Sequence, residues 1–300
     1  MKLHFGSRGR ISPTDLVFLE VKVPRESEET PESMVSFLAS LSHLLRGSSL
    51  LKRLGGKKPS LSLEIAAFDQ AIHFYLAMPQ AEQGYVESQV QSQYPKALLL
   101  PSPDYMAGWR EQPVAFGHLA YGAPSYYPLR TYVDFKDVDP LSSVLGVLSK
   151  AKEGEKLAIQ LVLSKASSGW ARAGRRALAG TTDSEGNVTK PEDADIIDSK
   201  ISQPGYEVCM RIIASAPTGQ QAASLVSNLS SAYGAFAHGE GNVLRFTAPK
   251  AWQRQNFLKA IFERRRAYCP RNQVFSLSEI ASLYHFPSII LATSGVSWGA

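Results

Sequence analysis

The chain of 300 residues has little of what usually marks an enzyme, a membrane protein or a secreted scaffold. Its two cysteines lie sixty residues apart without a CxxC spacing, and no apolar run reaches the roughly 18–20 residues that cross a bilayer. The first six residues lack the apolar core of a secretory signal. A GxxxxGK[ST] phosphate loop is also absent. These absences argue against a membrane-spanning protein, a disulfide scaffold and a P-loop ATPase within these residues.

Residues with catalytic or metal-binding chemistry are present but scattered. Six histidines show neither HxH nor HExxH spacing and have no nearby cysteine partners, so we expect no metal site. Carboxylates such as Glu64 and Asp69 show no partner in the sequence, and paired acid/base chemistry cannot be argued from them. We therefore expect no cofactor and no enzyme activity in this chain.

What is present is an ordinary globular composition. With 44% hydrophobic and 20% charged residues the chain can bury a sizeable core, and its length suits two domains of about 100–150 residues each. The net charge of +5 permits contact with nucleic acid or anionic lipid without arguing strongly for either. Cys209 lies in an apolar strand pattern, so we expect it to pack as a small hydrophobe in a reducing, cytosolic setting.

The first module, residues 1–113, shows the order strand, helix, strand, strand, helix, strand. Thr30 and Pro31 give a helix start, because proline at the first helical position has no N–H to lose. Asp69 and Gln70 separate two apolar runs and indicate a hairpin. The expected elements are strands at 15–24, 61–68, 71–78 and 97–100, and helices at 30–47 and 81–93.

The second module, residues 114–249, repeats this order once an acidic insertion at 181–205 is set aside. The expected elements are strands at 114–121, 129–135, 155–163, 206–214 and 243–248, and helices from Asp139-Pro140, at 168–180 and at 218–236. The pattern predicts an α+β protein of two tandem ferredoxin-like (βαββαβ) two-layer sandwiches. C-terminal helices follow in residues 250–300, where Trp252 and Phe257 mark one apolar face and Ser276 with Glu279 forms a capping box.

Three basic clusters are candidate contacts for nucleic acid or an anionic surface, although a solvated face is the simpler interpretation of each. The insertion has a net charge of −4, so we interpret it as a mobile loop that covers a basic patch. The clusters are Lys52, Arg53, Lys57 and Lys58; Trp170, Arg172, Arg175 and Arg176; and Arg264, Arg265 and Arg266 with Arg271.

Several segments, taken in order, resemble the N-terminal region of type IV secretion and conjugative DNA-transfer ATPases, especially a group common in small-genome bacteria. Each segment is short, but together they span nearly the whole chain. They are residues 19–26 (LEVKVPRE) with 30–34 (TPESM), 63–65 (LEI) with 72–75 (IHFY), 86–95 (VESQVQSQYP), 129–132 (LRTY) with 139–141 (DPL), and 277–287 (LSEIASLYHFP).

In such proteins a RecA-like motor follows this region, so the resemblance implies an ATPase motor in cis or in trans, with residues 250–300 as a helical linker toward it. The ATP-binding residues of the family lie beyond residue 300, and none is transferred to this chain. The resemblance further implies secretion-system subunits and possible DNA as partners, and a homo-oligomer in the full-length context. It places the chain in the cytoplasm, peripheral at the inner face of the cell membrane.

The expected function is therefore a non-catalytic accessory and assembly domain of a DNA-translocation ATPase. The main alternative is a nucleic-acid-binding module that uses the basic clusters. A small-molecule enzyme on the same scaffold is a second alternative, because ferredoxin-like folds serve many functions.

Overall fold

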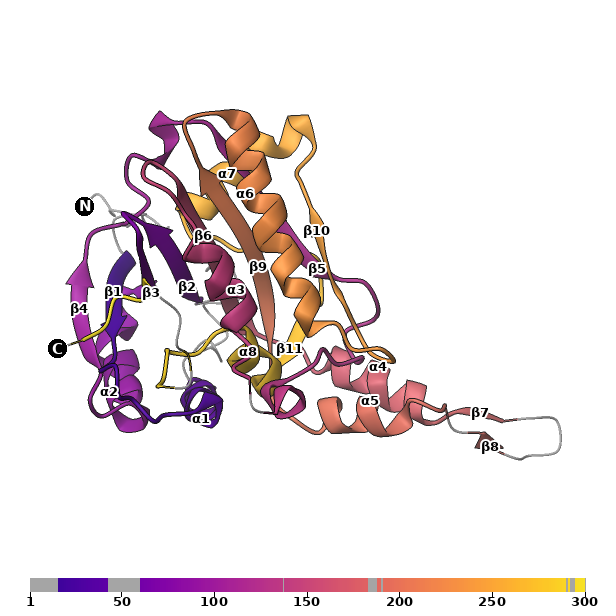
Figure 1. Ribbon diagram of the computed structural model, residues 1–300. Helices are drawn as coiled ribbons and strands as arrows, with labels where there is room; N and C mark the ends of the chain where they lie inside the picture. Colours follow the sequence, from indigo (N-terminus) through magenta and orange to yellow (C-terminus); the bar gives the residue numbers. More distant parts are fainter. Residues whose placement is uncertain are drawn as a thin grey trace, which may run out of the picture.

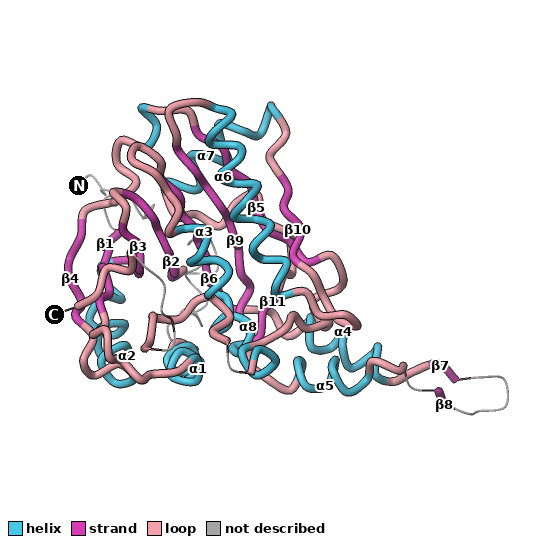
Figure 2. Tube along the Cα trace, in the orientation of Figure 1, coloured by secondary structure: helices cyan, strands magenta, loops and turns pink. Residues whose placement is uncertain are grey.

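The computed structural model describes residues 16–42, 60–136, 138–182, 188–189, 191–289, 291 and 295–299. Their main feature is a nine-stranded sheet in the order β10-β5-β9-β6-β2-β3-β1-β4, with β11 pairing to β9 in addition (Figures 1 and 2). Every pairing within this sheet is antiparallel. The α+β class predicted from the sequence is confirmed.

The first half of the sheet follows the predicted element order. It is built from β1 (Leu16–Lys22), α1 (Pro31–Ser40), β2 (Leu61–Phe68), β3 (Ala71–Pro79), α2 (Gln83–Gln93) and β4 (Leu98–Ser102). Asp69 and Gln70 form the hairpin turn with φ values of 49° and 61°, the left-handed conformation that a two-residue type I′ turn requires. The strands lie in the order β2-β3-β1-β4.

The second half has the same strand order, read as β6-β9-β5-β10. A helical insertion, α4 and α5, stands between β6 and β9, and a two-stranded arm projects from it (Figure 1). The elements are β5 (Val114–Tyr121), α3 (Ser142–Leu148), β6 (Lys156–Lys165), α4 (Gly169–Leu178), β7 (Thr181–Thr182), β8 (Val188–Thr189), α5 (Ala194–Ile201), β9 (Gly205–Ser215), α6 (Gly219–Ala232) and β10 (Leu244–Thr247).

Two expectations for this half are wrong. Residues 129–135 are not a strand, because Thr131 and Asp134 form a reciprocal capping box that starts a 3₁₀ helix at Tyr132–Phe135. The insertion at 181–205 is not simply a loop, because α5 buries Ile197 and Ile201. Lys200 Nζ lies 3.0 Å from Glu279 Oε2 with neither side chain exposed, which anchors α5 to the body.

The two halves join through β2 and β6, the second strand of each half. Leu61–Ala67 pair antiparallel with Leu157–Leu163, so Glu64 lies opposite Gln160 at the centre of the sheet. Nothing in the sequence pattern indicates this junction, because each half alone satisfies the strand pattern. One sheet therefore runs through both predicted modules.

One face of the sheet is covered by helices and is apolar. Helices α1, α2, α3 and α6 lie over this face (Figure 1). Alternate strand residues such as Leu63, Phe74 and Ile159 are buried there with apolar residues of these helices. Each fully buried side chain of this size contributes roughly 1.5–3 kcal/mol. This core contains residues of both halves.

The C-terminal segment, expected to be a helical linker, is packed into the same body. It forms α7 (Arg254–Phe262), β11 (Val274–Ser276) and α8 (Leu277–Leu283), whose predicted capping box is present. Phe257 and Ile261 of α7 are buried, whereas Trp252 is 75% exposed and is not part of the apolar face. Within the described residues, no helix is both long and apolar enough to cross a membrane.

The interpretation of Cys209 as an unpaired packed hydrophobe is also wrong. Its sulfur forms a disulfide with Cys269, whose Cα lies 5.4 Å from that of Cys209. The bond ties β9 to the connection between α7 and β11. A sequence separation of 60 hid this pairing, because only the fold brings the two residues together.

Candidate functional site

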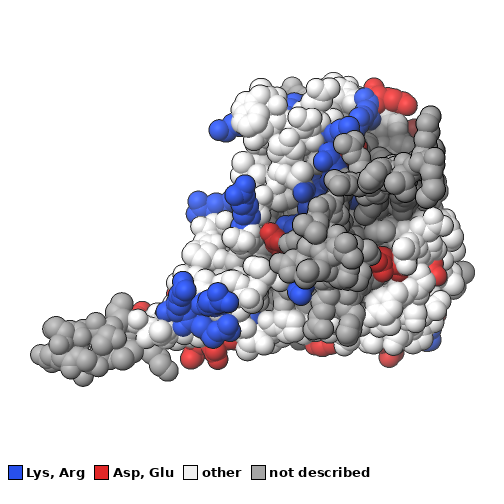
Figure 3. Space-filling model, turned by 180° about the vertical axis from the view of Figure 1, so that it is seen from behind, with Lys and Arg blue, Asp and Glu red and all other residues white. Residues whose placement is uncertain are grey.

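Helix α4 presents an exposed basic face. Arg172, Arg175 and Arg176 are spaced three and four residues apart, which places them on one side of the helix, and all three are exposed. None of the three has an acidic partner in the described part of the chain. Basic side chains gather beside the arm that carries β7 and β8 (Figure 3). This face can offer three guanidinium groups to an anionic partner without first breaking an ion pair.

A hollow lies under the opposite side of α4. It has a volume of about 460 Å³ and is lined by Trp170 and Ala173 of α4, by Tyr126, and by Arg271 and Asn272 of the C-terminal segment. Trp170 therefore belongs to this hollow rather than to the arginine face. The acidic residues of α5 form no ion pair with the α4 arginines among the described residues, so the idea that the insertion covers this patch gains no support.

The third basic cluster is not a surface patch as a whole. Arg264 is only 3% exposed, and its guanidinium is held by Glu64 and Asp104, with N–O distances of 3.1 and 2.6 Å. Arg265 and Arg266 are partly exposed and pair with Glu263 and Glu207. Arg264 therefore does not lie on a surface that nucleic acid or an anionic membrane could contact. The first cluster, Lys52, Arg53, Lys57 and Lys58, lies outside the described residues.

The sequence offered no partner for Glu64, but the structure supplies several. Arg264 and Gln160 donate to its carboxylate, as do the hydroxyls of Ser62 and Tyr105. Burial alone raises the pKa of Glu64, but Arg264 outweighs it and holds that pKa below its usual value. Asp104, Tyr105 and Arg264 come from segments distant in sequence, so no local spacing could have revealed this group.

Glu64 belongs to a polar row that crosses the second face of the sheet, opposite the apolar core. Residues directly opposite each other in neighbouring strands share a face, and the row follows from the strand register. In strand order from β4 to β10 it reads Leu100, Glu20, Tyr75, Glu64, Gln160, Arg211, His118 and Thr247. The alternation of side chains along each strand predicts a second face of the sheet. It does not predict that the centre of this polar row is fully buried.

Several buried polar atoms on this second face have no hydrogen-bond partner. They are Gln160 Oε1, Ser164 Oγ, Arg211 Nε and Nη2, His118 Nδ1, and Arg266 Nε. Buried polar groups are paired in the great majority of cases, so these atoms are exceptions to the usual pairing. No group of three or more His, Cys, Asp or Glu is arranged for a metal ion in the described ranges.

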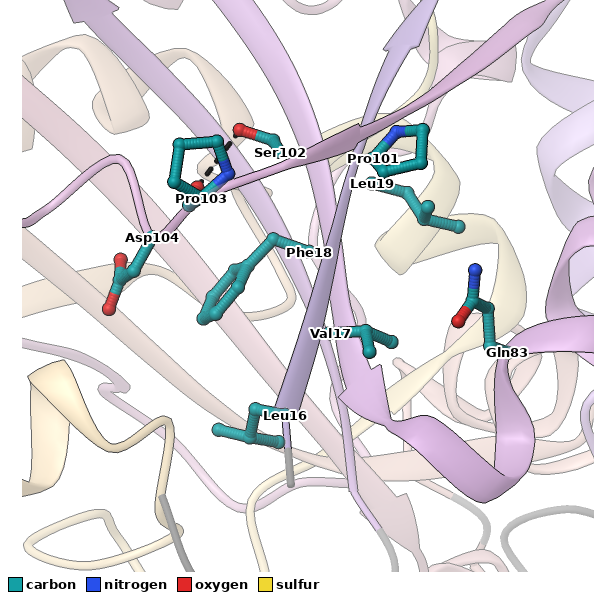
Figure 4. A pocket seen from close by; sticks show the side chains of 9 residues that line it. All are labelled: Leu16, Val17, Phe18, Leu19, Gln83, Pro101, Ser102, Pro103 and Asp104. Carbon is teal, nitrogen blue, oxygen red and sulfur yellow. Dashed lines mark hydrogen bonds between the residues drawn. The ribbon is translucent and has the colours of Figure 1, made fainter. Parts of the chain in front are cut away.

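The β4 edge of the sheet exposes apolar side chains. Strand β4 leaves Leu98 45% and Leu100 40% exposed and carries no charged residue. Beside it, between β1 and β4, lies a hollow of about 290 Å³ lined by Phe18, Pro101 and Pro103 (Figure 4). Native edge strands usually carry charges against unwanted pairing, so β4 has the properties of a docking edge.

Residues 295–299 read Gly-Val-Ser-Trp-Gly and so match the Gly-x-Ser-x-Gly pattern of serine hydrolases. In a nucleophile elbow the serine stands on a sharp turn between a strand and a helix. Here Val296 and Gly299 form isolated bridges with Ile72 and Pro24, and Ser297 N donates to Ile72 O. Because no helix follows Ser297 in the described residues, this segment lacks the elbow geometry.

The described residues form three features that could contact a partner or ligand: an arginine face, an apolar edge and a buried polar row. No curated protein matches the chain. A family model described as a domain of unknown function, DUF8128, matches residues 12–299. Because this match covers nearly the whole sequence, the chain belongs to the DUF8128 family.

Proposed function

We propose that this chain is the non-catalytic accessory module of a type IV secretion-like DNA-translocation ATPase, and that it assembles by pairing β4 with β4 of a second copy. The ordered resemblance of its segments to that protein class supports the ATPase context. The observation that carries the docking role is the uncharged β4 edge with exposed Leu98 and Leu100. In this proposal the motor, and any ATP, lie in another domain or chain.

A second copy of the chain fits this edge, because two β4 strands paired antiparallel are complementary to each other. Antiparallel pairing of two β4 strands about Leu99 sets Leu98 of one copy opposite Leu100 of the other. The leucines of both copies then share one face and shield each other from water. Pro101 has no N–H, so the ladder is confined to the residues before it. A C2 interface of this kind is the commonest form of homo-oligomer.

Sedimentation of the protein over a range of concentrations tests this role. We expect the wild type to form a dimer. The double variant Leu98→Arg/Leu100→Thr should remain a monomer, because it gives β4 the arginine and threonine that stand at the equivalent positions of the β10 edge, Arg245 and Thr247. The matched control, Val133→Arg/Val138→Thr, changes two exposed valines away from the edge and should dimerise like the wild type. A wild type that stays monomeric at high concentration contradicts the proposal.

We also propose that the two halves are tandem ferredoxin-like modules that share one sheet. The repeated order, fourth, first, third and second strand in each half, supports this assignment, with α4 and α5 as an insertion in the second half. An experimental structure with a different strand order in either half would contradict it.

We place the module at the cytoplasmic face of the membrane, where secretion-system subunits and the motor would be its partners. The disulfide between Cys209 and Cys269 bears on this placement, because thiols are kept reduced in most cytosols. Thiol labelling of protein taken directly from cells, without oxidation, measures whether this pair is bonded there. A fully bonded pair in every cell-derived sample would argue against the cytoplasmic placement.

A second candidate function is nucleic-acid binding through α4. Its three exposed arginines without acidic partners favour contact with phosphates, which releases counterions and makes affinity fall with salt. We expect Arg172→Ala/Arg175→Ala/Arg176→Ala to lower DNA affinity at low salt and to flatten the slope of log K against log salt by about three units. The control Lys96→Ala/Lys150→Ala/Lys152→Ala removes equal charge elsewhere, and an equal loss there would contradict a site on α4.

A further inference from the structure

The hollow under α4 combines an aromatic wall with a single charge. Its volume of about 460 Å³ lies in the range of ligand pockets, which is about 300–1,000 Å³. Trp170, Tyr121 and Tyr126 line it, and Arg271 is the only charged residue among its lining residues. These side chains favour a ligand that joins a flat ring to a negative charge, because rings stack on aromatic faces and guanidinium groups pair with anions.

Trp170 is held in place, yet its ring has no stacking partner. The backbone of β9 passes so close that a Cβ at Gly205 would lie 3.3 Å from Cζ2 of Trp170 and 2.8 Å from the backbone oxygen of Phe275. Within the described residues, no aromatic ring and no cation stacks on this indole. Because Trp170 is already partly buried, it can contact a ligand with little further loss of side-chain freedom.

A second wall of the hollow is built by close packing of α4. A Cβ at Gly174 would lie 3.0 Å from Cβ of Tyr126 and 2.6 Å from Cγ2 of Ile201 in α5. The buried Gly174 therefore lets α4 approach both neighbours at once. The hollow is thus preformed between packed elements, as ligand sites usually are.

The rim of the hollow carries polar groups that are available to a ligand. Arg271 is exposed and forms no ion pair within the described ranges. The backbone of Asn272 is engaged, because its oxygen accepts from Ser125 and its N–H donates to Glu207, whereas its side-chain amide bonds to no other described residue. A guanidinium suits a phosphate, and an amide can both donate to and accept from the edge of a base.

We propose that this hollow binds an unpaired base of a single-stranded nucleic acid, with the base stacked on Trp170 and the adjacent phosphate held by Arg271. Single-strand-binding proteins use this combination of an aromatic platform and a basic groove. A base inside a duplex is already stacked on its neighbours, so it must leave the stack before it can enter a pocket. The hollow therefore favours single strands over duplexes.

The inference rests on the nucleic-acid binding proposed above and specifies the form of the nucleic acid. The arginine face and the hollow lie on two sides of α4, and a helix is only about 10–12 Å across, so one flexible strand can contact both. Arg271 and the three α4 arginines are cations without acidic partners in the described part of the chain. A strand, which carries a charge at every nucleotide, fits this series of cations better than a peptide does.

Fluorescence anisotropy at low salt, with a short labelled single strand and the duplex of the same sequence, tests the proposal. We expect the wild type to bind the single strand more tightly. Trp170→Ala should weaken single-strand binding by about tenfold and leave duplex binding unchanged, because only the base contact is lost. Trp170→Phe retains a ring and should keep most of the affinity. The matched control Trp252→Ala removes an exposed indole outside the hollow and should change neither affinity.

An abasic strand separates the base contact from the phosphate contacts. It keeps every phosphate, so we expect the wild type to bind it no more tightly than Trp170→Ala binds the complete strand. Arg271→Ala should weaken single-strand binding more than Arg245→Ala, the control that removes an exposed arginine from β10. Equal affinity for strands with and without bases would overturn the proposal.

The α4 variant Arg172→Ala/Arg175→Ala/Arg176→Ala distinguishes the failure of this inference from the failure of the proposed function. If it weakens both DNA forms while Trp170→Ala weakens neither, nucleic-acid binding stands and the hollow is not a base site. If neither DNA form binds the wild type at low salt, both are wrong. Binding of an acidic, proline-rich peptide that depends on Trp170, without such dependence for the strand, would assign the hollow to a protein partner and refute the inference.

Discussion

The two halves of the sheet match each other position by position, yet they carry different chemistry. The antiparallel junction of β2 with β6 relates the halves by a pseudo-twofold axis, and the register on each side is the same. The equivalent pairs along the polar row are Glu64 and Gln160, Tyr75 and Arg211, Glu20 and His118, and Leu100 and Thr247.

The difference between the halves suggests a division of roles. In the first half the central acid Glu64 is neutralised by Arg264, and the outer edge is apolar. In the second half the outer edge carries Arg245 and Thr247, the insertion adds an arginine face, and the buried Arg211 has Nε and Nη2 without hydrogen-bond acceptors. A common backbone thus carries an uncharged edge with exposed leucines on one side and exposed arginines on the other.

The largest expected effect comes from comparing Glu64 with its equivalent Gln160. Glu64→Ala leaves the buried guanidinium of Arg264 with one carboxylate fewer, and breaking such a pair costs about 3–5 kcal/mol. Gln160→Ala removes a neutral amide, and we expect a loss of about 1–3 kcal/mol. Chemical denaturation of both variants measures the difference. Equal losses would show that the charge at the centre of the row is unimportant.

The ion pair of Glu64 with Arg264 predicts how the free energy of unfolding depends on pH. The pKa of Glu64 is lower in the folded state than its ordinary value of 4.5. Its contribution is therefore present above about pH 4.5 and is lost as the pH falls through the folded value. We expect Glu64→Gln to flatten the acid limb of a stability profile, while Asp198→Asn on the exposed side of α5 leaves it unchanged. An unaltered acid limb in Glu64→Gln would contradict the ion pair.

The disulfide is the next largest difference, since only the second half has one. Cys209→Ala/Cys269→Ala should cost about 2–4 kcal/mol, mainly by freeing the unfolded chain. The loss should appear as a lower denaturation midpoint and as faster amide exchange in the segment from α7 to β11. The wild type in reductant should behave in the same way. A variant as stable as the oxidised wild type would show that the bond is not formed in solution.

The smallest expected effect on stability, but a clear one on assembly, comes from exchanging the edges. Arg245→Leu/Thr247→Leu gives β10 the side chains of β4, and surface changes of this kind usually alter stability by less than about 0.5 kcal/mol. We expect the variant to form species larger than a dimer, because each copy then has two docking edges. Light scattering after size exclusion measures this. A variant that stays the size of the wild type would show that leucines alone do not make a docking edge.

Much of the fold followed from local patterns in the sequence. The hairpin at Asp69 and Gln70, the proline start at Pro31 and the capping box of Ser276 with Glu279 depend on neighbours within four residues. The strand at 129–135 failed for the same reason, because the cap formed by Thr131 and Asp134 outweighed its apolar alternation. Local chemistry thus accounts for both the successes and this error.

The site residues could be predicted only in part. The spacing of Arg172, Arg175 and Arg176 on one helix face was visible in the sequence, because all three belong to one element. The partners of Glu64, the isolation of Arg211 and the bond between Cys209 and Cys269 were not visible. These depend on contacts between segments 41–200 residues apart, which no single element encodes.

The central claim is that the β4 edge pairs with a second copy. Amide hydrogen exchange of the wild type at low and high protein concentration tests it most directly, with the β10 peptide as an internal reference. We predict that amides of residues 97–100 become more protected as concentration rises, while those of 244–247 do not change. Identical exchange of the β4 peptide at both concentrations, or protection of both edges alike, would contradict the account.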